Sequence, residues 1–76
     1  MFSVSPEQLQ TILVEIEDHP DLQSLALHIE DLLEDGEYAF YDIDPLPHEI
    51  EPLYMALAGH RDLTVLVAQL RTALFL

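Results

Sequence analysis

The sequence predicts an all-α fold of four short helices, arranged as two αα-hairpins that an internal pseudo-repeat relates to each other. Three observations support this. Apolar residues recur at helical spacing in four segments, Pro and Gly mark the segment ends, and residues 6–35 match 47–76 at an offset of 41 without a gap. The chain of 76 residues is expected to form one small helical domain, 1–76, near the size at which a single core is barely sufficient.

The first helix is expected to begin at Pro6. Ser5 and Gln8 have the spacing of a capping box, and proline suits the first helical position because its missing N–H would have no partner there. A helical pattern of apolar residues then extends to about residue 17: Leu9, Ile12, Leu13 and Ile16.

The second helix is expected to follow Pro20, which cannot lie inside a helix but suits a first turn. Gly36 is a natural C-terminal stop, because it adopts the left-handed conformation without strain. The apolar positions between them again have helical spacing: Leu22, Leu25, Ala26, Ile29, Leu32 and Leu33.

A non-helical linker at about 36–47 is expected between the hairpins, because it is rich in Pro and aromatic residues. The third helix should begin near Pro47 and end at Gly59, although Pro52 favours a slightly later start. The fourth helix should span about 61–75.

The repeat is visible in identities and in apolar pattern. Each of the twelve apolar residues in 6–35 aligns with an apolar residue in 47–76 at the offset of 41. Helical periodicity alone does not keep two helix pairs in phase across their connecting turns. The identities are Pro6/Pro47, His19/His60, Asp21/Asp62, Leu22/Leu63, Leu25/Leu66 and Leu33/Leu74.

The repeated motif His-x-Asp-Leu contains His19, Asp21, His60 and Asp62. These side chains could form a carboxylate/histidine metal or acid–base site. The Glu-x-x-His element of carboxylate-bridged bundles is absent, however, since none of the four histidines has Glu three residues before it. We therefore expect two structural helix corners, with each Asp near the positive end of a helix dipole.

The composition excludes several classes of function. A net charge of −13 opposes direct binding to nucleic acid or anionic membranes and attracts basic proteins. No apolar run approaches the length of a membrane span, and the chain has neither cysteine nor an export signal, so a cytoplasmic location is expected.

The acids are concentrated in the middle of the chain, and we expect them to form a partner-binding face together with tyrosines of the linker. No Lys or Arg occurs among the first sixty residues to balance them. Tyr38, Phe40 and Ile43 could instead fill the gap between the hairpins. The acids could instead form a solvated face whose charge keeps an apolar protein soluble. The expected face comprises Glu30, Asp31, Glu34, Asp35, Glu37, Tyr38, Tyr41, Asp42 and Asp44.

The segment 63–76 is apolar around most of a helix, which predicts burial on more than one side. A second copy of the chain is the first expectation for its partner, giving a homodimer, and a dock for another protein is the second. The residues expected to mediate self-association are Val65, Val67, Leu70, Leu74 and Phe75.

Together these features predict a small, acidic, non-enzymatic interaction module (an adaptor, regulator or inhibitor) that binds a basic partner protein and needs no cofactor. No nucleophile–base pair, phosphate loop or cofactor motif favours catalysis. One alternative is a DNA mimic that occupies the nucleic-acid site of a DNA-binding protein. A less favoured alternative is a carboxylate/histidine metal-binding protein.

Overall fold

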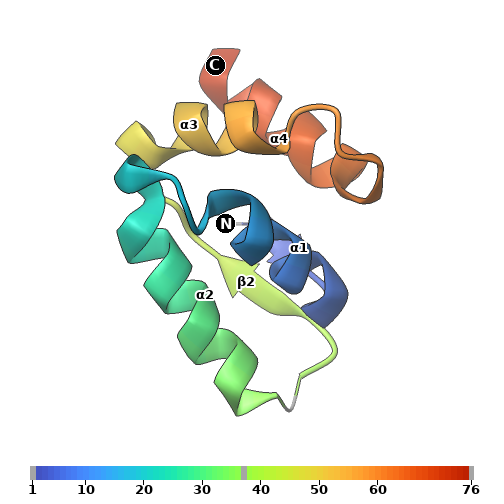
Figure 1. Cartoon of the computed structure of the whole chain (residues 1–76). Helices are drawn as coiled ribbons and strands as arrows, with labels where there is room; N and C mark the ends of the chain where they lie inside the picture. Colours follow the sequence, from blue (N-terminus) through green and yellow to red (C-terminus); the bar gives the residue numbers. More distant parts are fainter. Residues whose placement is uncertain (1, 37, 76) are drawn as a thin grey trace.

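The computed structural model describes residues 2–36 and 38–75 and contains four α-helices with a small antiparallel sheet (Figure 1). The predicted four-helix fold is confirmed. Helix α1 packs on α2 and α3 packs on α4, as expected for two hairpins. The elements in chain order are β1 (Phe2–Val4), α1 (Pro6–Ile16), η1 (Pro20–Leu22), α2 (Gln23–Asp35), β2 (Tyr41–Ile43), α3 (Pro47–Leu57), η2 (Arg61–Leu63) and α4 (Thr64–Phe75).

The helix boundaries of the two halves correspond at the offset of 41. Adding 41 to both bounds of α1 gives the bounds of α3, and the same addition converts η1 into η2 and the start of α2 into the start of α4. The two halves therefore have the same order and placement of helices and 3₁₀ turns. Equal boundaries do not establish descent, so the duplication itself stays a prediction.

The two-stranded sheet was not expected from the sequence. Strands β1 and β2 pair antiparallel, with Phe2 opposite Ile43, Ser3 opposite Asp42 and Val4 opposite Tyr41. The first pair joins residues separated by 41 positions, the offset of the repeat. The other two pairs join residues that are 39 and 37 positions apart, so only Phe2 and Ile43 are related by this offset.

The hydrophobic core draws on both halves and on both strands. Five pairs of equivalent residues are buried: Ile12/Leu53, Ile16/Leu57, Leu22/Leu63, Leu25/Leu66 and Ile29/Leu70. Val4, Tyr41 and Ile43 of the sheet join the same cluster. A single core between the hairpins therefore holds the chain together.

Both helix corners differ from the prediction in detail. Helices α2 and α4 begin at Gln23 and Thr64, after a 3₁₀ turn, rather than near Pro20 and residue 61. The side chain of Gln23 stabilises the first corner, because its Nε2 donates to the carbonyls of Glu17 (2.9 Å) and His19 (2.8 Å). At the second corner the Thr64 hydroxyl donates to the Arg61 carbonyl at 3.3 Å.

Helix α3 begins at Pro47 and accommodates Pro52 in its interior. The ring nitrogen of Pro52 cannot donate to the carbonyl of His48, so one bond of the helical ladder is missing there. Gly36 ends α2 in the left-handed conformation, with φ of 60°, as the sequence predicts. Among the described residues, no helix has the length and hydropathy needed to cross a membrane.

Candidate functional site

The first His-x-Asp-Leu motif forms a capped corner. His19 precedes the 3₁₀ turn η1, and its Nδ1 accepts a hydrogen bond from the backbone N–H of Asp21 at 3.3 Å. This bond satisfies a donor that the start of the turn would otherwise leave without a partner. The structural interpretation of His19 as a corner residue is supported by this contact.

The second motif has different contacts. The His60 side chain makes no capping bond to η2. Its Nε2 instead lies 3.8 Å from Oε1 of Glu15 in α1, while its Nδ1 is enclosed and has no hydrogen-bond partner among the described residues. Asp62 contributes its backbone carbonyl, which accepts from Nε2 of Gln8 at 3.2 Å. The second corner thus binds α1, across the interface between the halves.

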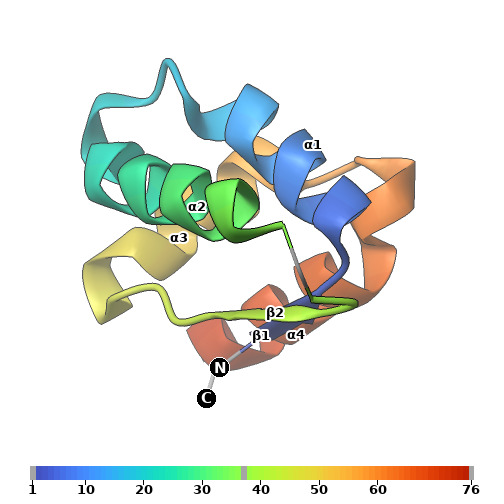
Figure 2. The same ribbon diagram turned by 90° about the horizontal axis from the view of Figure 1, so that it is seen from below.

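The two corners do not form a common site. They lie at opposite ends of the molecule in both views (Figures 1 and 2). Within residues 2–36 and 38–75, no three His, Asp or Glu side chains come together in a group that could hold a metal ion. The structure does not bring His19 or Asp21 close to His60 or Asp62.

The four acids at the C-terminal end of α2, Glu30, Asp31, Glu34 and Asp35, are all exposed. Both arginines of the chain, Arg61 and Arg71, lie in η2 and α4. The end of α2 therefore combines a concentration of carboxylates with the negative end of the helix dipole, which makes it attractive to cations.

The linker divides into residues that are exposed and residues that join the core. Tyr38 is exposed and packs edge-on against Tyr41, with ring centroids 5.7 Å apart and an interplanar angle of 84°. Tyr41 is itself buried, so its placement on the partner-binding face was wrong. Ile43 fills the core, whereas Phe40 is 67% exposed and does not fill the gap between the hairpins. Glu37 lies outside the described residues.

Burial alternates strictly from residue 40 to residue 46, which is the signature of an extended chain with one face toward the core. Tyr41, Ile43 and Pro45 are buried, whereas the residues between them are exposed. Proline at 45 and 47 disfavours the helical conformation of the residue before it, so the segment stays extended beyond β2. The exposed set is Phe40, Asp42, Asp44 and Leu46, which we call the acidic strand face.

Leu46 was not predicted to belong to this surface, although the period-2 pattern of the linker is a signal for it. Apolar residues at 41, 43 and 45 alternate with acids at 42 and 44. An alternation over so few residues, with prolines at 45 and 47, looks like an irregular linker. Only the pairing with β1 makes it a strand.

The residues expected to mediate self-association are divided between the core and two separate surfaces. Leu70 is buried within the single chain, so its assignment to a dimer interface was wrong. Val67 and Leu74 are half-buried, while Val65 and Phe75 are exposed. Much of the apolar surface of α4 is therefore buried within its own chain.

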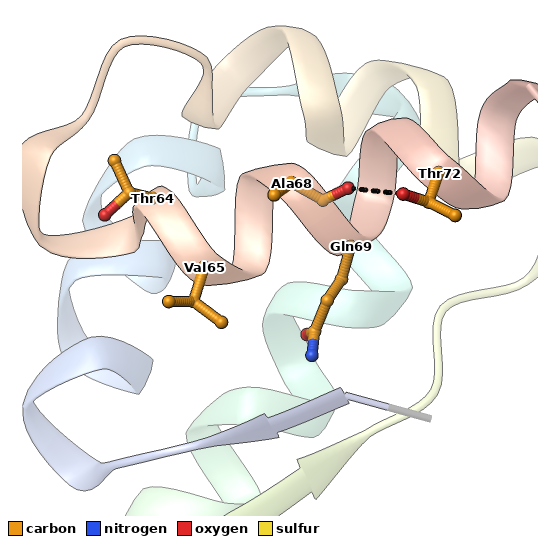
Figure 3. Close-up of a pocket in the computed structure, with 5 residues that line it drawn as sticks. All are labelled: Thr64, Val65, Ala68, Gln69 and Thr72. Carbon is orange, nitrogen blue, oxygen red and sulfur yellow. Dashed lines mark hydrogen bonds between the residues drawn. The ribbon is translucent and has the colours of Figure 1, made fainter.

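The two exposed residues border different hollows. Val65 lines a shallow hollow on the outer face of α4, together with Thr64, Ala68, Gln69 and Thr72 (Figure 3). The Thr72 hydroxyl there donates back to the Ala68 carbonyl at 3.0 Å. Phe75 lines another hollow between α3 and α4, with Glu51, Tyr54, Met55 and Leu74. We call the first of these the α4 outer face.

No family of known proteins, no curated protein and no solved structure matches this chain.

Proposed function

We propose that this chain is a non-enzymatic protein-interaction module, an adaptor, regulator or inhibitor, that binds a basic surface of a partner protein. The observation that supports this most is continuity along the chain: the exposed acids of α2 lead directly into the exposed aromatic and acidic side chains of 38–46. Carboxylates form charge-assisted hydrogen bonds with Arg and Lys, and the rings of Tyr38 and Phe40 provide faces for cation–π contacts.

The arrangement on α2 is costly for the free protein. Glu30 with Glu34 and Asp31 with Asp35 are like-charge pairs one helical turn apart, and each such pair costs about 0.2–0.5 kcal/mol. A basic partner would remove this repulsion on binding. A surface that violates local rules for helix stability is more often found at functional sites than elsewhere.

Charge neutralisation tests the proposal. A variant with E30Q, D31N, E34Q and D35N should lose capture of its partner from a cell lysate at low salt, because the carboxylates no longer attract the basic surface. The matched control removes the same number of exposed charges away from the end of α2, one in the first turn of α1 and three around the first corner: E7Q, E17Q, D18N and D21N. Capture that is equally strong for both variants, or indifferent to salt, would count against the proposal.

The identity of the captured protein decides between a general adaptor and a DNA mimic. A DNA mimic should compete with duplex DNA for its target, because its carboxylates take the places of phosphates. A partner whose affinity for DNA is unchanged by saturating amounts of this chain would remove that alternative.

Self-association belongs to the proposal as a second property. The α4 outer face carries an exposed valine, and Thr64–Phe75 contains no acidic residue. Two copies can therefore meet there without opposing their carboxylates. A cytoplasmic location also remains part of the proposal, supported by the absence of cysteine.

A further inference from the structure

The sheet has an edge that suits a third strand. Within the described residues, β2 has β1 as its only strand neighbour. In Figure 2, β2 is the nearer of the two strands and no other element is drawn over it. The backbone groups on the edge of β2 away from β1 are thus directed toward the outside of the sheet.

Side chains around this edge form an ordered pattern. The acidic strand face presents Phe40, Asp42, Asp44 and Leu46 at every second residue, which is the spacing of one face of a strand. Ser3 of β1 lies opposite Asp42 and is exposed beside it. The pattern along the chain is apolar, acidic, acidic, apolar, and it covers about 20 Å at ~3.3 Å per residue.

We propose that the open edge of β2 binds an extended segment of a partner protein as a third strand, and that this segment has the pattern apolar-x-basic-x-basic-x-apolar. The inference rests on the proposed function and specifies the partner's chemistry. Residues directly opposite each other on neighbouring strands share a face and lie about 4.5–5.5 Å apart at their Cβ atoms. Basic residues of the segment would therefore meet Asp42 and Asp44, and its apolar residues would meet Phe40 and Leu46.

Charge selects this occupant over a second copy of the chain. Pairing β2 with β2 of another molecule would bring Asp42 and Asp44 close to the same two acids of the partner, and like charges directly opposite each other are destabilising. Acids on an exposed edge are a usual protection against unwanted strand pairing. The same acids favour a cationic strand, whose backbone adds hydrogen bonds and whose side chains add specificity.

Pro45 limits the length of the proposed backbone pairing. Pro45 has no N–H to donate, so backbone pairing is confined to the residues before it. Leu46 then contributes only through its side chain. The proposed contact is therefore short, and the side-chain pattern must provide much of its selectivity.

Two synthetic peptides of equal composition test the inference. In Val-Thr-Arg-Thr-Arg-Thr-Leu both arginines lie on one strand face, whereas in Val-Thr-Thr-Arg-Arg-Thr-Leu they lie on opposite faces. NMR titration of the isotope-labelled full chain should show the first peptide binding about fivefold more tightly than the second. Slowed amide exchange should be confined to residues around β2.

Variants assign the binding to the strand. Asp42→Lys should weaken binding of the first peptide by about tenfold. The control is Glu17→Lys, an equal charge change at an exposed residue after α1, which should retain most of the affinity for this peptide. Equal affinity for the two peptides, or shifts limited to α2, would overturn the strand proposal and leave the general proposal for basic partners standing. Binding of neither peptide at low salt would contradict both proposals.

Discussion

Gln8 and Glu49 occupy equivalent positions in the two halves and make the same backbone contact. The Gln8 Oε1 accepts from the N–H of Ser5 at 2.9 Å, and Oε1 of Glu49 accepts from the N–H of Leu46 at 2.7 Å. Only the glutamine also donates, from Nε2 to the Asp62 carbonyl. A carboxylate has no donor for the equivalent bond.

Replacing Glu49 by Gln should therefore stabilise the protein. Glu49 is only 4% exposed, and the substitution retains the acceptor for Leu46 while it replaces a buried carboxyl group by an uncharged amide. The amide also provides a donor toward η1, against which α3 packs. The free energy of unfolding in urea at neutral pH should rise by about 0.5–1.5 kcal/mol.

The reverse substitution at the equivalent position is the control for Glu49→Gln. Gln8→Glu should lower the free energy of unfolding, because it removes the donor to the Asp62 carbonyl. Destabilisation by Glu49→Gln would show that the carboxylate makes a contribution which an amide cannot replace.

Substitutions at the N-terminal caps of α1 and α3 should change the stability of the protein in opposite directions. The Ser5 hydroxyl accepts from the N–H of Gln8 at 3.2 Å, and Ser5→Ala should cost about 1 kcal/mol. Leu46 has the same extended backbone but no side-chain acceptor, so Leu46→Ser should gain a similar amount. Thermal unfolding followed by circular dichroism measures both, with the exposed Ser24→Ala as a control that should change little. A cap effect of the same sign at both positions would contradict the argument.

Two leucines on α2 allow the stability contributed by a buried side chain to be compared with that of an exposed one. Leu25 is buried and Leu27 is 63% exposed. Leu25→Ala should lower the free energy of unfolding by about 2–5 kcal/mol, because it leaves a cavity in the core. Leu27→Ala should change it by less than about 0.5 kcal/mol. Equal losses in denaturant titrations of the two variants would mean that the outer face of α2 is buried in solution.

Two valines test self-association through the α4 outer face. Val65 is 70% exposed on α4 and Val14 is 64% exposed on α1. Val65→Asp should reduce the dimer fraction in sedimentation experiments, because it brings two carboxylates together across the interface. Val14→Asp adds the same charge and should leave the dimer fraction nearly unchanged. A monomeric wild-type chain at high concentration would eliminate this interface.

The helices were predictable because their signals are local. Ser5, Gln8, Pro6 and Gly36 specify helix ends through contacts within a few residues, and apolar periodicity identifies the inner face. The strands were not predictable in the same way. Each has three residues, and β1 pairs with a segment about forty positions away along the chain.

The candidate surface was predictable in charge but not in composition. The acids of α2 are exposed because carboxylates are costly to bury, and their position on the helix was evident from its apolar pattern. Phe40 and Tyr41 are adjacent aromatic residues with similar preferences. Only the register of β2 directs Tyr41 inward and Phe40 outward, since a shift of one residue would exchange them.

By itself, the sequence determined four helices, two hairpins, the offset of 41 between them and the strong acidity. Tertiary structure decided which apolar side chains are buried: Leu70 lies in the core, while Val65, Phe40 and Leu46 are exposed. The physical reason is that helix ends and charge depend on near neighbours, whereas burial depends on which distant elements pack together. Pairing of β1 with β2 is such a distant contact, and it creates the acidic strand face.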